Sequence, residues 1–234
     1  MNTPFVINIG RQLGSGGREI GRMLADRFGI AYYDKEILSL AAQESGLGPD
    51  VFERKDERKG FFSSMFSVVQ PFIGGGGDFY NNQLSEEHLF TLQSRVIQKV
   101  AAERSCLFIG RVADYILRNH PRHVNIFIAA NLDDRIKRIM EREKLDRKDA
   151  RTRIEDSDEE RADYYNFYSS GTWGSADTYD LCINASVLGC ARTAEFIAQF
   201  ISEKLNVELP PAPAEMPFGC EASKSISAEI SERA

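Results

Sequence analysis

The chain contains the segment Gly10-Arg11-Gln12-Leu13-Gly14-Ser15-Gly16-Gly17-Arg18-Glu19 between an apolar run and an amphipathic one. The apolar run, Phe5–Ile9, predicts a buried strand. After the glycines, apolar residues recur at helical spacing up to a possible C-cap at Gly29: Ile20, Met23, Leu24 and Phe28. Glycines let backbone N–H groups converge on an anion, and a helix N-terminus adds partial positive charge. The segment therefore predicts a phosphate-binding turn; the alternative is a tight strand-to-helix turn without a ligand.

The segment departs from the standard phosphate-binding motif G-x-x-x-x-G-K-S/T at its end. If Gly16 is the second glycine, the lysine position holds Gly17, followed by Arg18 and Glu19. We expect the loop to bind the phosphates of ATP through Gly14, Ser15, Gly16, Gly17, Arg18 and Glu19. Arg18 is a catalytic candidate that would replace part of the missing charge, and Glu19 is the candidate ligand of Mg²⁺. The alternative is that both side chains turn to solvent and Glu19 only favours the first helical turn.

Composition sets the broad class. The chain has 234 residues, of which 42% are apolar and 27% charged, with a net charge of −6. This composition is typical of a globular protein with a large core and argues against general nucleic-acid binding. The four cysteines show no C-x-x-C spacing, which indicates thiols in a reducing compartment. The sequence has no leader-like pattern and no run near the ~20 apolar residues of a membrane span, so we expect a cytoplasmic protein without a membrane partner.

Strand and helix patterns alternate along the chain. Further strands are predicted at 30–34, 106–110, 124–130 and 180–185, and helices at 37–46, 50–58, 85–103, within the charged region 132–170, and from about 191 to 205. The continuous apolar runs of the strands favour a parallel sheet buried on both faces. Segment 60–83 contains four consecutive glycines at 74–77, so we expect it to be mobile, either as a loop that closes over substrate or as a surface insertion. The residues after Asn206 are expected to form a disordered tail.

Ligands of parallel α/β sheets bind beyond the carboxyl ends of the strands. This rule selects Asp34 and Lys35 after the second strand, and Arg111 and Asp114, which are expected to open the next helix, after the third. A carboxylate at Asp34 is suited to a catalytic role, with N-capping of the next helix as the alternative. Arg111 is suited to grip a phosphate, with a surface salt bridge as the alternative. The region after the fourth strand is arginine-rich (Arg135, Arg138, Arg142, Arg147, Arg151, Arg153 and Arg161), which fits either a solvated helix or a segment that closes on phosphates.

Four segments together resemble the cytidylate-kinase-like branch of the P-loop nucleoside monophosphate kinases. They are Ile9–Gly17, Tyr33-Asp34-Lys35-Glu36, Phe108–Asp114 and Asp158-Glu159-Glu160-Arg161-Ala162, and the resemblance covers about residues 5–205. It implies a three-layer α/β fold with a five-stranded parallel sheet, an acceptor-binding insertion at 35–105 and an arginine-rich helical lid at 131–172. It also implies transfer of the ATP γ-phosphate, with Mg²⁺, to a nucleoside monophosphate or another small acceptor.

The resemblance also suggests roles for individual residues. Arg161 and Arg111 would bind the phosphate of the acceptor, with Asp158 and Asp114 orienting an arginine or the base, and Asp34 and Lys35 completing the acceptor site. The catalytic candidates are Arg18, Asp34 and Arg161. Cytidylate kinases carry G-K-G-T where this chain has Gly16-Gly17-Arg18-Glu19, so the loop lysine and the hydroxyl on the magnesium side are both absent. Two other functions stay open: a nucleotide-binding regulator without turnover, and a partner-binding α/β protein.

Overall fold

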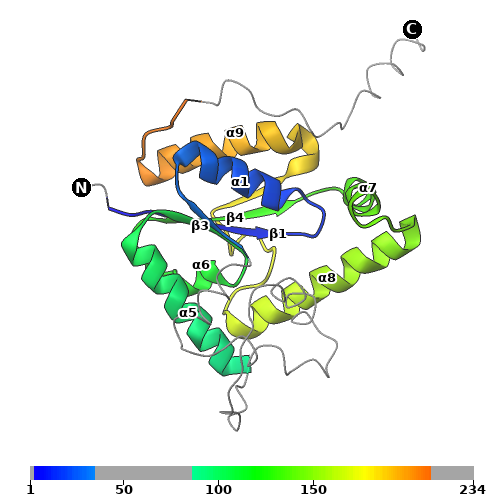
Figure 1. Ribbon diagram of the computed structural model, residues 1–234, viewed down its shortest axis with the longest axis horizontal. Coiled ribbons are helices and arrows are strands. Elements are labelled where there is room, and N and C mark those ends of the chain that lie inside the picture. The colour runs from blue at the N-terminus through cyan, green and yellow to red at the C-terminus, as the bar shows by residue number, and fades with distance from the viewer. Residues whose placement is uncertain (1–2, 35–85, 212–234) are drawn as a thin grey trace, which may run out of the picture.

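The computed structural model describes residues 3–34 and 86–211 as a three-layer α/β domain (Figure 1). Its strands are β1 (Val6–Arg11), β2 (Ala31–Tyr33), β3 (Cys106–Ile109), β4 (His123–Ala129) and β5 (Leu181–Asn184). Its helices are α1 (Gly17–Phe28), α5 (Glu86–Glu103), α6 (Ala113–Ile116), α7 (Leu132–Glu143), α8 (Arg147–Tyr168) and α9 (Ala185–Leu205).

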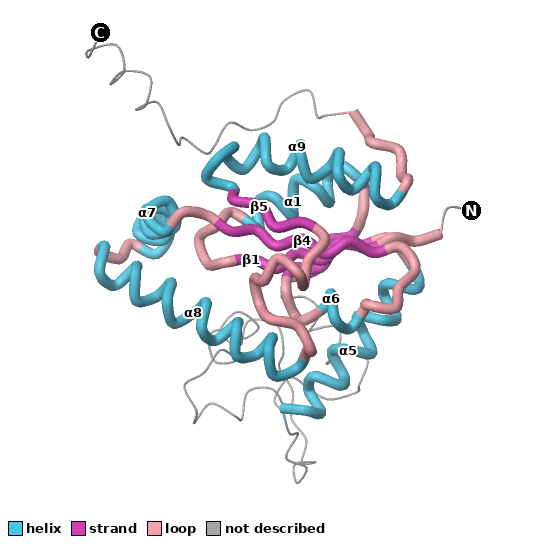
Figure 2. Tube along the Cα trace, turned by 180° about the vertical axis from the view of Figure 1, so that it is seen from behind, coloured by secondary structure: helices cyan, strands magenta, loops and turns pink. Residues whose placement is uncertain are grey.

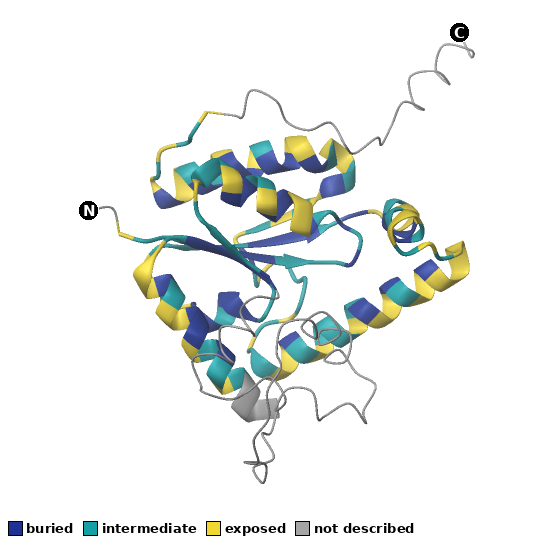
Figure 3. Ribbon diagram, viewed as in Figure 1, coloured by how far each residue is buried: buried dark blue, intermediate teal, exposed yellow. Residues whose placement is uncertain are grey.

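The sheet is parallel throughout, in the order β2-β3-β1-β4-β5. Strand β1 is central, and Ile9 stands in register with Ile109 on β3 and Ile126 on β4. These three isoleucines are buried, as the dark central strands in Figure 3 illustrate. The predicted class, a five-stranded parallel α/β fold, is confirmed, because continuous apolar strands can be covered on both faces only by helices.

Helices cover both faces of the sheet (Figure 2). Helices α1 and α9 pack on one face, where Ile20 and Leu24 join Ile197 and Ile201 in the main core. On the other face, α5 and α6 form a second cluster with β3, centred on Phe108. Helices α7 and α8 pack against each other beside the glycine-rich turn through a third cluster of Leu13, Ile136, Ile139, Ala150 and Ile154.

The helix boundaries agree with the sequence pattern, with two differences. Helix α9 begins at Ala185 rather than near 191, but Gly189 breaks it with φ 74° and ψ 164°, so the regular part starts close to the predicted position. Helix α6 begins only at Ala113, because the residues before it have left-handed backbone. Helix α1 ends as predicted at Gly29, whose φ of 61° is the left-handed C-cap conformation that glycine adopts readily.

Residues 206–211 pack onto the domain although the sequence assigned them to the tail. Val207 and Leu209 contact the main core, and Arg27 donates a hydrogen bond of 3.0 Å to the carbonyl of Pro210. The predictions for Lys35, for the helices at 37–46 and 50–58, for segment 60–83 and for the tail from 212 lie outside the described residues. None of the helices that the structure describes is long and apolar enough to cross a membrane.

Candidate active site

The glycine-rich turn connects the central strand to the first helix. Gly14 and Gly16 have φ angles of 77° and 83°, which residues with a side chain rarely adopt. Between them, Ser15 turns back, donating from its N–H and its hydroxyl to the carbonyl of Gln12 at 3.3 and 2.9 Å. The two left-handed glycines fold the chain tightly at the carboxyl end of β1, where the sequence predicted a phosphate-binding turn.

The N-terminus of α1 carries no side-chain cap. Gly16 is the N-cap, and its carbonyl accepts the first hydrogen bond of the helix from the N–H of Ile20 at 3.0 Å. The N–H groups of Gly17, Arg18 and Glu19 therefore have no acceptor within the helix. Such groups, together with the helix dipole, favour an anion. The turn thus fits the phosphates of a nucleotide.

The outer side of the turn is fastened to the helices at 132–168. Arg135 donates to the carbonyl of Leu13 at 2.7 Å, and Arg138 donates to the carbonyl of Gly14 at 2.9 Å. The N–H of Leu13 in turn donates to Asp158 on α8 at 2.8 Å. Two arginines of the predicted lid therefore donate hydrogen bonds to the backbone of the turn in this structure.

Asp34 lies beyond β2 and pairs with arginines of the turn. Its carboxylate is 2.7 Å from Nε of Arg18 and 3.8 Å from a terminal nitrogen of Arg11. The Asp34 side chain is only 10% exposed, whereas that of Arg18 is half exposed. Arg18 is thus directed toward Asp34, while Glu19 is exposed in the first turn of α1.

Three other guanidinium groups repel the positive charge of Arg11 in this region: Arg161, Arg18 and Arg111. Burial, followed by repulsion from Arg161, lowers the pKa of Arg11 to about 9, although Asp34 opposes the shift. Burial also lowers the pKa of Arg161 to about 10, against the attraction of Asp158. Positive charges crowded in a poorly hydrated place are stabilised by an anion.

Asp158 connects this cluster to the turn. Besides the Leu13 N–H, it accepts from Arg161 at 3.2 Å and forms an ion pair with Arg135. The Nε of Arg161 is buried without a hydrogen-bond partner among the described residues. The predicted pair Asp158 and Arg161 therefore lies together, one turn apart on α8, with a donor of Arg161 left for a ligand.

Arg111 lies in a strained turn after β3. Gly110, Arg111 and Val112 have φ angles of 69°, 65° and 57°, so three consecutive residues are left-handed. This conformation is uncommon for arginine and an outlier for the β-branched Val112. The amide of Gln93 on α5 donates to the Arg111 carbonyl at 3.3 Å. The prediction that Arg111 opens the following helix is wrong, because α6 starts only after the turn.

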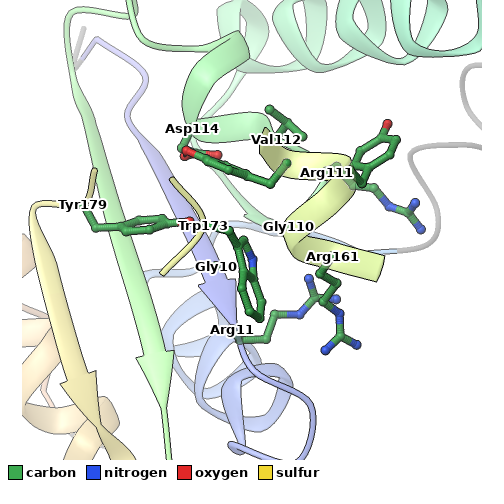
Figure 4. A pocket seen from close by; sticks show the side chains of 11 residues that line it. Gly10, Arg11, Gly110, Arg111, Val112, Asp114, Arg161, Trp173 and Tyr179 are labelled. Carbon is green, nitrogen blue, oxygen red and sulfur yellow. The ribbon is translucent and has the colours of Figure 1, made fainter. Parts of the chain in front are cut away.

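An open pocket lies where these elements meet (Figure 4). It is lined by Gly10, Arg11, Gly110, Arg111, Val112, Asp114, Arg161, Tyr164, Tyr165, Trp173 and Tyr179. Arg11 and Arg161 converge on one side in Figure 4, and the Trp173 ring lies close to them. The lining combines cationic and aromatic side chains, which is suited to an anion that carries a flat ring.

Asp114 is a buried residue in the lining of the pocket. It accepts a hydrogen bond from the hydroxyl of Tyr165, and burial raises the pKa of its carboxyl despite that bond. The hydroxyl of Tyr179 is buried nearby without a partner among the described residues. Asp114 therefore contacts a tyrosine here and holds no arginine in any contact that the structure describes.

Sequence reasoning missed Arg11 and the aromatic residues Tyr164, Trp173 and Tyr179. Arg11 stands at the carboxyl end of a strand, so the rule that selected Asp34 and Arg111 could also have selected it. The aromatic residues come from α8 and the connection to β5, and no local pattern indicates that they meet. Among residues 3–34 and 90–211, no three acidic, histidine or cysteine side chains cluster as a metal site.

Comparisons with known proteins agree with this fold. The family model described as "Cytidylate kinase-like family" matches residues 6–187. A structure of an uncharacterized protein from Eubacterium ventriosum is 28% identical, covers 85% of this chain and 98% of its own, and superposes with a TM-score of 0.64. A shikimate kinase from Acinetobacter baumannii in complex with shikimate is 16% identical over 87% of this chain and 96% of its own, with a TM-score of 0.48. No curated protein matches the sequence.

Proposed function

This chain belongs to the cytidylate kinase-like family, and from that membership and the site geometry we propose that it is an ATP-dependent phosphotransferase. It moves the γ-phosphate of ATP to a nucleoside monophosphate or another small anionic acceptor. The observation that carries the proposal is the adjacency of two anion sites. The stem of Arg11, which lines the pocket, lies against Gly17, whose N–H belongs to the uncapped end of α1.

The donor would bind at the glycine-rich turn. The N–H groups of Gly17, Arg18 and Glu19 face its phosphates, as in other helix N-termini that bind anions. Magnesium in proteins is commonly held by one or two carboxylates plus the phosphates of the substrate, and it would neutralise part of their charge. Glu19 and Asp34 are the candidate carboxylates, although Asp34 pairs with Arg18 in this structure.

The acceptor would bind in the pocket. Arg161 and Arg111, which line the pocket, would hold its phosphate or carboxylate, and Trp173 and Tyr164, which also line it, would pack against a ring. An acceptor oxygen then attacks the γ-phosphorus while the bond to the β-phosphate oxygen breaks, which releases ADP. The arginines contribute by positioning and by neutralising the charge on the transferred group, which is the main work in phosphoryl transfer.

The regions around the pocket take roles in this proposal. Segment 35–105 is the acceptor-binding insertion, of which the structure describes 86–105, and residues 131–172 form the lid. A cytoplasmic location remains a prediction from the sequence. The cysteines that the structure describes, Cys106, Cys182 and Cys190, are free thiols.

A release assay for ADP tests the proposal. Wild-type protein with ATP and Mg²⁺ is screened against nucleoside monophosphates and small phosphorylatable metabolites. We expect ADP release that depends on one acceptor class. Arg161→Lys should raise the acceptor KM by about tenfold or more and leave ATP affinity nearly unchanged, because lysine cannot form the bidentate contact.

The control and the second candidate function use the same assay. Arg151→Ala removes a cation from the exposed face of α8 and should leave both constants unchanged. Gly17 at the lysine position favours the second candidate, a nucleotide-binding regulator without turnover. ATP binding without acceptor-dependent ADP release would support the regulator and contradict the phosphotransferase.

A further inference from the structure

Arg11 and Gly17 occupy two special positions of the phosphate-binding motif. With Gly16 as the second glycine of G-x-x-x-x-G-K-S/T, the first glycine of the motif falls at Arg11 and the lysine at Gly17. The chain thus has a cation where the motif has glycine, and glycine where the motif has a cation. The number of cations at these two positions is unchanged, but the charge has moved from one side of the turn to the other.

The structure brings the two positions into contact. A Cβ atom on Gly17 would lie 2.7 Å from Cβ and 3.0 Å from Cγ of Arg11. Side-chain carbons do not approach so closely, and the Cβ atoms of both residues are fixed by the backbone. A lysine at position 17 and an arginine at position 11 therefore exclude each other, which makes the two exchanges a single coupled change.

The Arg11 side chain reaches from the turn into the pocket. Its guanidinium lies over Gly110, where a Cβ atom would collide with it, and Figure 4 shows it converging with Arg161. The side chain is 14% exposed and approaches Asp34 only to 3.8 Å. Arg11 therefore extends from beside the N-terminus of α1 into the pocket.

Arg18, the first candidate for the missing charge, is engaged elsewhere. Its Nε lies 2.7 Å from Asp34, and half of the side chain is in solvent. An exposed charge is screened by water, whereas a buried one acts strongly on a neighbouring anion. The low pKa of Arg11, caused by burial and by repulsion from Arg161, also indicates a cation that an anion would stabilise.

We propose that Arg11 takes over the role of the missing loop lysine and holds the transferred phosphate of the donor. Position 17 is glycine because a side chain there would collide with Arg11. This inference rests on the proposed phosphotransferase function and adds the residue that carries the donor-side charge. It replaces the sequence-based hypothesis that Arg18 supplies that charge.

Moving the cation back tests the proposal. The variants are Arg11→Gly, Gly17→Lys and the double variant Arg11→Gly/Gly17→Lys, which restores the first glycine and the lysine of the standard motif. Calorimetry measures the affinity for inorganic tripolyphosphate, and thermal denaturation shows that each variant is folded. We expect Arg11→Gly to lose about tenfold or more in affinity, and about a hundredfold in kcat where turnover is measured. The double variant should recover most of the lost affinity and of the lost kcat. Gly17→Lys alone should unfold at a lower temperature or bind tripolyphosphate more weakly, because the lysine side chain collides with Arg11.

The outcomes separate this inference from the proposed function. Tripolyphosphate affinity that follows the Arg11 and Gly17 variants supports the inference even if no acceptor is phosphorylated, in which case only the transfer function fails. Unchanged affinity in a folded Arg11→Gly variant overturns it, as does a folded double variant that recovers nothing. Arg151→Ala, which removes one exposed arginine, serves as the control for net charge and should bind tripolyphosphate like the wild type.

Discussion

Arg111 adopts a left-handed backbone between two residues that do the same, and nothing in its chemistry favours that conformation. Left-handed backbone costs an L-residue about 1–2 kcal/mol. Conformations of this kind persist where the surroundings enforce them, often at ligand sites. Here the strained turn places Arg111 and Val112 at the wall of the pocket.

Glycine at position 111 should separate strain from function. Arg111→Gly should be more stable than Arg111→Ala by about 1 kcal/mol, because glycine tolerates positive φ and alanine does not. Both variants should raise the acceptor KM equally. Denaturant unfolding and steady-state kinetics measure the two effects.

A helical position provides the control for this comparison. At Tyr115, within α6, the order should reverse, with Tyr115→Ala more stable than Tyr115→Gly. Equal stabilities of the two variants at position 111 would mean that the left-handed backbone carries no cost there.

Asp114 gives a prediction on pH. Burial raises its pKa in the folded state, so the folded chain keeps the proton at pH values where the unfolded chain has lost it. Stability contributed by this group therefore falls as pH rises above the ordinary pKa of an aspartate, near 3.8. Asp114→Asn can still accept the Tyr165 hydrogen bond without a buried charge, so its stability relative to wild type should increase as pH rises.

Thermal denaturation from about pH 4 to about pH 8, the range that spans ordinary carboxyl and histidine pKa values, measures this difference. Asp163→Asn, an exposed position on the same helix as Tyr165, should show no such trend. A stability difference between Asp114→Asn and wild type that is independent of pH would contradict the raised pKa.

For individual residues, the sequence predicted which side chains follow the strands better than it predicted which other side chains they contact. Asp34, Arg111 and Asp114 were found because they follow strands whose carboxyl ends share one edge of the sheet. Their contacts were not predictable, since the ion pair of Arg18 with Asp34 and the bond of Tyr165 to Asp114 join distant segments. Comparison with the motif singles out Gly17 and Arg18, which stand at its lysine and hydroxyl positions. It does not single out Arg11 as a site residue, although Arg11 stands in the same segment.

Side chains of α7 and α8 form hydrogen bonds with the backbone of the glycine-rich turn. Asp158 on α8 contacts both the turn and Arg135 of α7. It contacts the Leu13 N–H, Arg135 and Arg161, so one carboxylate serves the turn, one helix and the pocket. Such a group couples donor and acceptor sites if its loss affects both.

We expect Asp158→Asn to weaken ATP and acceptor binding together. The amide keeps an oxygen for the Leu13 N–H but loses the charge that faces Arg135 and Arg161, and stability should fall by about 2 kcal/mol. Asp156→Asn, exposed two residues earlier on α8, is the matched control. If only the acceptor KM changes, Asp158 belongs to the pocket alone and does not couple the two sites.

Periodicity was sufficient for most elements. The helices α1 and α5 and the apolar strands agree with their predicted ranges to within a few residues, whereas α7 and α8 were predicted only as helical structure within the charged region 132–170. The short helix α6 was misplaced because left-handed residues at 110–112 leave no trace in the hydrophobic pattern. The sequence pattern of the arginines fitted either a solvated helix or a segment that closes on phosphates, and neither alternative indicated that Arg135 is buried and donates to the backbone of the turn.

At the scale of the whole molecule, topology explains why the site forms where it does. Strand β1 lies between β3 and β4, so the turn after it is flanked by the strained turn after β3 and by the start of α7 after β4. Residues more than a hundred positions apart thereby meet at one edge, as Arg11 and Arg161 do in Figure 4. The family resemblance predicted the five-stranded parallel sheet that brings these residues together, and the exchange of Arg11 and Gly17 is one of the places where the chain departs from the standard phosphate-binding motif.

A single-turnover experiment with ATP labelled at the γ-phosphate tests the central claim most directly. Protein in excess over labelled ATP, with Mg²⁺ and the acceptor panel, is quenched at short times, and the labelled products are separated. The account predicts that the label moves into one new small-molecule phosphate, at a rate that falls in Arg11→Gly and recovers in Arg11→Gly/Gly17→Lys. Label that stays in bound ATP, or that appears only as inorganic phosphate whatever acceptor is present, would contradict it.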